Sequence, residues 1–108
     1  MANTATVEER RLVLQGILEE IAGQGKVYFN PPENIKLSYP CIVYNRSRVN
    51  DRYADGIVYD KMTEYDITYI TRDPREAPFE EFEKLPYCSH NRHYVTDNLH
   101  HDVFTMHI

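Results

Sequence analysis

The residues most able to do chemistry lie in the C-terminal stretch 85–108. This stretch holds Cys88 and all five histidines of the chain. The histidines considered as ligands are His90, His93, His100 and His101. Neutral imidazole and thiolate are common zinc ligands. If the stretch forms a hairpin that turns near Asp97-Asn98, His93 lies across from His101 or Asp102, and such a pair could share a zinc ion.

The strand pattern of the same stretch argues against a catalytic metal. A catalytic zinc site needs about three protein ligands and an open position. Side chains an odd number of residues apart point to opposite faces of a regular strand, so His90 and His93 are expected to diverge, as are His100 and His101. The sequence contains neither HExxH nor a paired CxxC. We therefore predict no metal ligands and place the histidines on strand surfaces. A small histidine-dependent metal-binding enzyme is the alternative from a different functional class.

Other catalytic chemistry is not favoured either. A nucleophilic Cys88 would need a base beside it and an electropositive site, but the last third of the chain is acidic. We expect Cys41 and Cys88 to be reduced, buried thiols. The four glycines are scattered, so no phosphate-binding loop is present. The carboxylates Glu64 and Asp66 share a strand face but would need a cleft. We predict no catalytic residue, no cofactor and no enzymatic activity.

Two helices are predicted. Thr6 and Glu9 form a capping box at the start of the first, and glycines at 23 and 25 end it. Its apolar stripe is formed by Leu14, Ile17, Leu18 and Ile21. A second helix is expected over 78–84, where Phe79 and Phe82 lie three apart and can both face a sheet.

The strands are read from alternation and from turn residues. A short strand is expected at 26–29 and longer ones at 41–48, about 57–71, 87–95 and 100–107. Residues 30–40 form a loop, and 50–56 a polar connection that turns at Asp55-Gly56. Tyr65, Ile67 and Tyr69 should face the core. The predicted fold is one α+β domain over residues 1–108, with an antiparallel sheet of about four strands, two helices on one face, and the order helix-strand-strand-helix-strand-strand.

The charge pattern favours contacts between protein subunits. The net charge of −5 argues against a nucleic-acid binder. The one basic cluster is formed by Arg46, Arg48 and Arg52, of which Arg46 and Arg48 should share a strand face. It is either a solvated edge or an ion-pair surface complementary to acidic residues of a neighbouring subunit. The acidic candidates are Glu64 and Asp66 on the long strand and Glu80 and Glu83 on the second helix. No apolar run is long enough to cross a membrane, and the N-terminus does not read as a signal peptide.

Several segments together carry a family resemblance. They are the run Tyr39–Tyr44, the strand through Tyr65–Ile70, the stop Arg72-Asp73-Pro74, the stretch Leu85–Asn98 and Val103–Thr105. In these segments the chain resembles the tail terminator, or tail completion, proteins found at the neck of long-tailed bacteriophages. The shared motifs are structural and assign no active-site residue.

The resemblance implies an antiparallel sheet flanked by helices and assembly into a hexameric ring. Such a ring ends growth of the tail tube and joins the tail to the head connector. Its partners would be further copies of the chain, the tail tube protein and the head completion protein. DNA would pass through the lumen without specific binding. The protein would be made in the bacterial cytoplasm and end in the virion. One alternative is another connector or stopper component of the phage neck. Another is a toxin-type or regulatory module with a similar arrangement of helices and sheet.

Overall fold

The elements follow one another in a mixed order of helices and strands. A computed structural model describes residues 6–54 and 57–108, and within 50–54 and 57–62 only the backbone is described. The helices are α1 (Val7–Ala22) and α2 (Phe79–Glu83), with a 3-10 turn at Pro74–Glu76. The strands are β1 (Val27–Phe29), β2 (Cys41–Ala54), β3 (Ile57–Thr71), β4 (Cys88–Thr96) and β5 (Leu99–His107).

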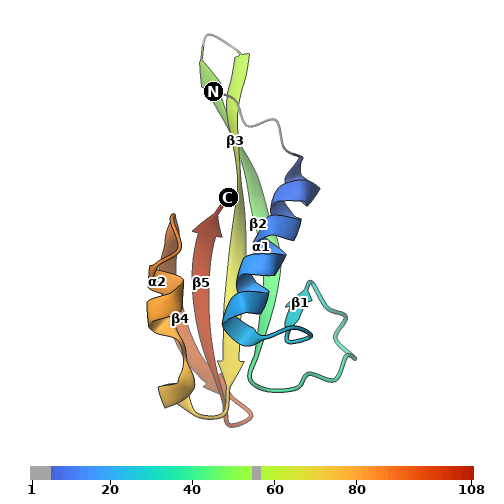
Figure 1. The fold of residues 1–108 in the computed structure, drawn as a ribbon, viewed down its shortest axis with the longest axis vertical. Coiled ribbons are helices and arrows are strands. Elements are labelled where there is room, and N and C mark those ends of the chain that lie inside the picture. Colours follow the sequence, from blue (N-terminus) through green and yellow to red (C-terminus); the bar gives the residue numbers. More distant parts are fainter. Residues whose placement is uncertain (1–5, 55–56) are drawn as a thin grey trace.

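The strands form one sheet with the order β1-β2-β3-β5-β4 (Figure 1). The predicted α+β class is confirmed, but the prediction of about four antiparallel strands is wrong. The short strand β1 joins the sheet as a fifth strand and pairs in parallel with β2, Val27 lying opposite Ile42. The irregular segment 30–40 makes this possible, because a parallel pair needs a crossover connection rather than a tight turn. The other three pairings are antiparallel.

The boundaries of the long hairpin also differ from the prediction. Strand β3 matches the predicted range, whereas β2 runs on to Ala54 instead of ending near Arg48. Residues 50–54, expected to be a polar connection, are therefore part of a strand. The predicted turn at Asp55-Gly56 lies outside the described residues.

Helix α1 is held at both ends by local interactions. The Thr6 hydroxyl oxygen accepts a hydrogen bond from the Glu9 N–H at 3.1 Å, which is the N-terminal cap that was predicted. At the other end Gly23 has a φ of 101°, in the region that favours glycine, and its N–H bonds to the Glu19 carbonyl. Leu14 and Leu18 are fully buried. The helix therefore packs on the sheet along one stripe, as expected.

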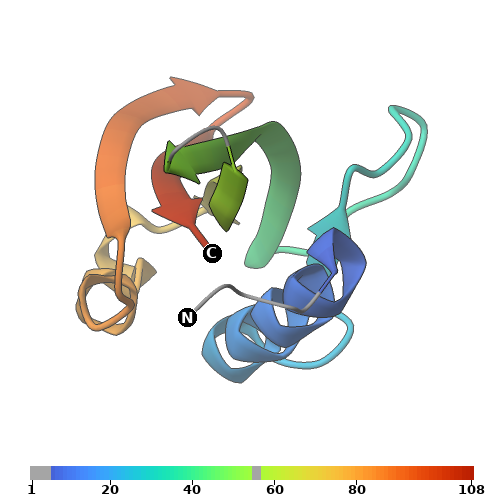
Figure 2. The ribbon, with the colours of Figure 1, turned by 90° about the horizontal axis from the view of Figure 1, so that it is seen from above.

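The core lies between the sheet and both helices. Tyr65 and Ile67 are fully buried and Tyr69 is nearly so, which confirms the predicted core face of β3. Helix α1 contributes Leu14 and Leu18 to this core, and α2 contributes Phe82. Figure 2 shows the two helices on the same side of the curved sheet.

Strands β2 and β3 extend beyond the rest of the sheet as a hairpin arm, which we define as residues 50–54 and 57–62. The pairing of β3 with the C-terminal segment ends where Thr63 and Ile108 exchange backbone hydrogen bonds of 2.8 and 2.9 Å. Among the described residues, the two strands of the arm pair only with each other. The arm projects at the top of Figure 1 and gives the molecule dimensions of 51 × 25 × 22 Å.

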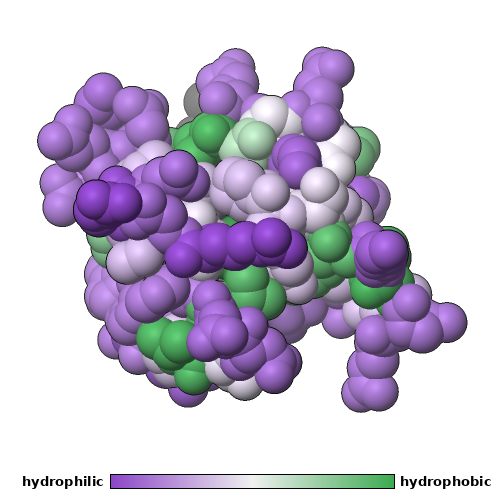
Figure 3. Space-filling model, turned by 90° about the horizontal axis from the view of Figure 1, so that it is seen from below, coloured by the Kyte–Doolittle hydropathy of each residue, from purple (hydrophilic) through white to green (hydrophobic). Residues whose placement is uncertain are grey.

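The end opposite the arm is mostly hydrophilic. Seen from below, its hydrophobic residues form small, separate patches (Figure 3). In the part of the chain that the structure describes, no helix is long and apolar enough to cross a membrane.

Phe82 should be the residue through which α2 stabilises the fold. Its ring is 1 % exposed and stacks on Phe104 with ring centres 4.2 Å apart. We expect Phe82→Ala to lower the free energy of unfolding by about 3–5 kcal/mol, measured by urea denaturation, because it removes buried area and leaves a cavity. Phe79→Ala is the matched control, since Phe79 is 38 % exposed and should cost clearly less. Equal losses in the two variants would contradict this role of Phe82.

Candidate subunit interface and histidine cluster

A β-bulge in β2 separates the predicted basic cluster. Arg46 lies opposite Tyr65, but Arg48 lies opposite Glu64, so Ser47 is an extra residue in the ladder. Directly opposed residues share a face of the sheet, and Tyr65 and Glu64 point to opposite faces. The prediction that Arg46 and Arg48 share a face is therefore wrong. The extra residue shifts the alternation of side chains by one.

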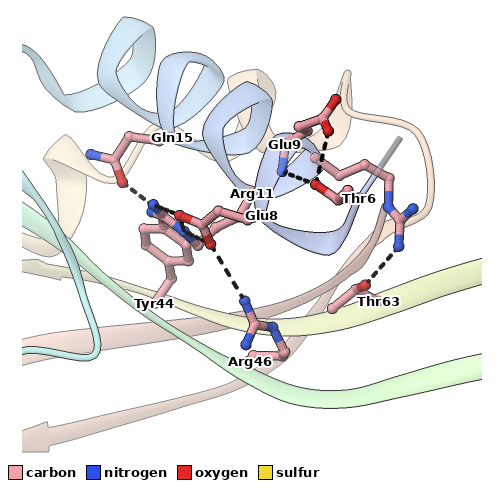
Figure 4. A network of polar contacts seen from close by, with 9 residues as sticks. Thr6, Glu8, Glu9, Arg11, Gln15, Tyr44, Arg46 and Thr63 are labelled. Atoms are coloured by element: carbon pink, nitrogen blue, oxygen red, sulfur yellow. Dashed lines mark hydrogen bonds and ion pairs between the residues drawn. The ribbon is translucent and has the colours of Figure 1, made fainter. Parts of the chain in front are cut away.

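Arg46 faces α1 and interacts within its own chain. Its guanidinium lies 5.6 Å from the ring centre of Phe29 and 5.8 Å from that of Tyr65. Its Nη2 is 4.0 Å from a carboxylate oxygen of Glu8 (Figure 4). Through these contacts Arg46 helps to hold helix α1 against the sheet.

Arg11 is the centre of this polar network. Its Nε donates to both carboxylate oxygens of Glu8 at 3.0 Å, and its Nη1 donates to the buried Tyr44 hydroxyl at 3.0 Å. The Tyr44 hydroxyl in turn donates to the Gln15 side-chain carbonyl (Figure 4). Burial raises the pKa of Tyr44, so the hydroxyl remains a donor. The network fixes α1 against β2, and the sequence pattern did not reveal it.

Glu64 is also satisfied within the chain. Its carboxylate accepts from the Ser47 hydroxyl at 2.9 Å and from His107 Nε2 at 3.1 Å, and Arg48 Nε lies at 3.7 Å. The Ser47 hydrogen bond, followed by that of His107, holds the pKa of this carboxyl below its usual range. Arg48 and Glu64 therefore pair between β2 and β3 of one chain, and the predicted ion pairs with a neighbouring subunit stay a prediction.

The other interface candidates form fewer contacts within the chain. Asp66 is half-buried and accepts from the Thr105 hydroxyl at 3.5 Å. Glu80 and Glu83 are exposed on α2, as predicted. The side chain of Arg52 lies outside the described residues.

Glu83 lies at the rim of a small pocket between α2 and the sheet. The pocket has a volume of about 190 Å³ and its wall includes Phe79, Phe104, Cys88 and His90. Cys88 is half-buried rather than fully buried as predicted, and burial raises its pKa. Burial also raises the pKa of the fully buried Cys41 to about 11. Both thiols are therefore poor nucleophiles at neutral pH.

A β-bulge in β4 changes the face to which one of the histidine side chains points. His90 lies opposite Phe104, but Arg92 lies opposite Val103, which makes Asn91 an extra residue in β4. His90 and His93 consequently point to the same face of the sheet. The prediction that they diverge is wrong, because it assumed a regular strand. Of the two residues predicted to lie across from His93, Asp102 is the one that does, and His101 lies across from Tyr94.

The bulge brings both imidazoles to one buried carboxylate. Asp102 is 2 % exposed, and its Oδ1 lies 3.1 Å from His90 Nε2 and 2.9 Å from His93 Nδ1. The other ring nitrogen of His93, Nε2, lies 3.4 Å from His100 Nδ1. His101 points to the opposite face and stacks on Tyr94 with ring centres 4.5 Å apart, so the predicted divergence of His100 and His101 is confirmed. We call His90, His93, His100 and Asp102 the histidine cluster.

The chemistry open to the histidine cluster is proton exchange or ligand binding. Asp102 fixes the orientation of two imidazoles, as carboxylates do in many functional sites. Among the described residues, no hydrogen bond joins the cluster to a hydroxyl or thiol that could act as a nucleophile. In the same part of the chain, no group of three or more His, Cys, Asp or Glu side chains is placed to hold a metal ion.

Comparison with models of protein families finds no match, and neither does comparison with curated proteins. The resemblance to phage neck proteins consequently depends on the sequence segments that carry it.

The contacts of Glu64 should make stability depend on pH. Because its pKa is lowered in the folded state, the ionised carboxylate stabilises the fold. This contribution is complete above the ordinary value of 4.5 and is lost as the pH falls through the folded-state pKa. We expect the urea midpoint of the wild-type chain to fall between pH 5 and pH 3 more steeply than that of Glu64→Gln.

The exposed residue Glu80 supplies the matched control. Glu80→Gln should follow the wild-type pH dependence. If Glu64→Gln does so as well, the Ser47 and His107 contacts do not stabilise the ionised form.

Proposed function

We propose that the chain is a structural virion subunit of a long-tailed bacteriophage. In this proposal, copies assemble into a ring at the head-proximal end of the tail tube, and the resemblance implies that the ring is hexameric. The ring ends tail growth and joins the tail to the head connector. The observation that carries the proposal is the hairpin arm, which the resemblance did not supply.

The arm needs a partner that the single chain does not provide. A two-stranded hairpin is marginally stable in water, and its outer edges leave backbone N–H and C=O groups free to pair. Over residues 57–62, β3 has β2 as its only described neighbour. A second copy of the chain, placed beside the first around a ring, can supply the missing contacts.

Ring symmetry fits this arrangement. A ring uses a heterologous interface, in which one patch meets a different patch on the next subunit. The arm is at one end of the molecule, while the exposed Glu80 and Glu83 lie on α2. Arg48, with 65 % of its side chain exposed, is available for a further contact despite its distance of 3.7 Å from Glu64. These separate surfaces can meet in a heterologous contact.

The net charge supports passage of DNA rather than its retention. The chain carries a net charge of −5, and a negative ring lumen would repel the phosphate backbone. The proposed partners are accordingly the tail tube protein and the head completion protein, with DNA passing through without specific binding.

Removal of the arm should abolish ring formation and leave the fold intact. Val49 and Thr63 lie opposite each other, so Asn50–Met62 can be replaced by Asn-Gly, which forms a two-residue hairpin turn. We expect the wild-type chain to sediment as a ring in the presence of purified tail tubes and to cap one tube end in electron micrographs. The shortened chain should remain monomeric and leave tubes uncapped.

The control changes the other hairpin in the same way. The turn at Asp97 and Asn98 has φ values of 52° and 61°, which Asn-Gly also adopts. Replacing Asp97-Asn98 by Asn-Gly should preserve capping. Rings formed equally well by the folded, shortened chain would refute the role of the arm.

The position of the subunit in the virion can be tested by removing it from phage-producing cells. We expect over-long tails or tails without heads in negative-stain images, because nothing then ends the tube or joins it. Tails of normal length on heads that lose DNA would instead indicate a connector or stopper component. Intact, infectious particles would contradict any role in the neck.

A further inference from the structure

We propose that His93 and His100 form a binding site for one divalent transition-metal ion, such as Zn²⁺. In this site Asp102 orients His93 without touching the metal. The inference rests on the geometry of the histidine cluster and does not depend on the proposed role in the virion.

The first step is the assignment of the free nitrogen of His93. The buried Asp102 carboxylate accepts a hydrogen bond and cannot donate one when ionised, so the Nδ1 of His93, 2.9 Å away, must carry the proton. In a neutral imidazole the other nitrogen, Nε2, then presents its lone pair. A carboxylate that fixes the tautomer of a histidine in this way is a regular outer partner of metal-binding histidines.

The second step is the distance between the two imidazoles. His93 Nε2 and His100 Nδ1 are 3.4 Å apart, which is longer than the usual N–H hydrogen bond. Two nitrogen ligands 2.0–2.1 Å from one tetrahedral zinc ion lie about 3.3 Å apart. The pair therefore already has the spacing of ligands that share one ion.

The third step concerns access and charge. The side chain of His93 is 41 % exposed, so an ion can enter from solvent. Asp73 carries a further carboxylate near His100: hydrogen bonds from Arg75 are the main cause of its lowered pKa, and His100 contributes to the shift. Asp73 is already paired with Arg75 at 3.0 Å, so it is mainly the buried Asp102 carboxylate that favours a cation over an anion.

The number of ligands fixes the kind of site. No third metal-binding side chain is in place among the described residues, so water fills the remaining coordination positions. Such a site binds more weakly than a structural zinc site with three or four protein ligands. Its open positions also leave room for a ligand from another molecule.

The direct test is a titration of the wild-type chain with ZnCl₂, followed by the ¹⁵N resonances of the imidazoles. We expect one ion per chain, with shifts centred on His93 Nε2 and His100 Nδ1 and none at His107. The absence of saturable binding, or shifts centred on other histidines, would overturn the proposal. This measurement needs no variant and is independent of effects on folding.

Calorimetric titration of variants tests the roles of the individual residues. His93→Gln and His100→Gln should each weaken zinc binding at least 10-fold, because each removes one of two ligands, and Asp102→Asn should weaken it about 10- to 100-fold. His107→Gln is the matched control, because His107 lies on the same strand but bonds to Glu64 on the other face. Unchanged affinity in His100→Gln, or an equal loss in His107→Gln, would refute the site.

Discussion

The fold depends on the alternation of side chains along β3. Over residues 64–71 this strand has neighbours on both sides, so that part of its backbone is paired along both edges and its register is fixed. With the register fixed, Tyr65, Ile67 and Tyr69 all point to one face, and that face receives both helices. A shift of one residue would turn these three side chains to the other face and replace them with Glu64, Asp66 and Thr68. The burial of tyrosines and the position of the carboxylates are thus two results of one constraint.

The same alternation explains which parts of the candidate sites could be predicted. Where the pairing is regular, as between β5 and residues 64–71 of β3, the sequence correctly predicted the core face and the divergence of His100 and His101. Where one residue is added, at Ser47 and Asn91, the predictions for Arg46 and Arg48 and for His90 and His93 were reversed. Neither residue carries a sequence signal that announces a bulge. The positions of both bulges follow from pairing with distant strands, which a local pattern does not contain.

The predictability of the fold has a similar physical basis. Helix α1, the loop 30–40 and the turn at Asp97-Asn98 are set by capping residues, prolines and turn residues that act over a few positions, and these were predicted. The parallel pairing of β1 with β2 was not predicted, because a three-residue strand gives no indication of its partner. The Arg11 network was also missed, since Glu8, Tyr44 and Gln15 meet only after the helix has docked. Long-range contacts therefore account for most of what the sequence left open.

The bulge at Asn91 also bears on how easily β4 can pair with strands of other chains. Strand β4 is an outer strand of the sheet, nine residues long, and such strands readily recruit other chains into aggregates. A bulge interrupts the even spacing of backbone donors and acceptors and twists the strand locally. An incoming strand can consequently match only part of the edge at a time. The residue that brings two imidazoles to Asp102 is therefore also expected to hinder edge-to-edge pairing of β4 with other chains.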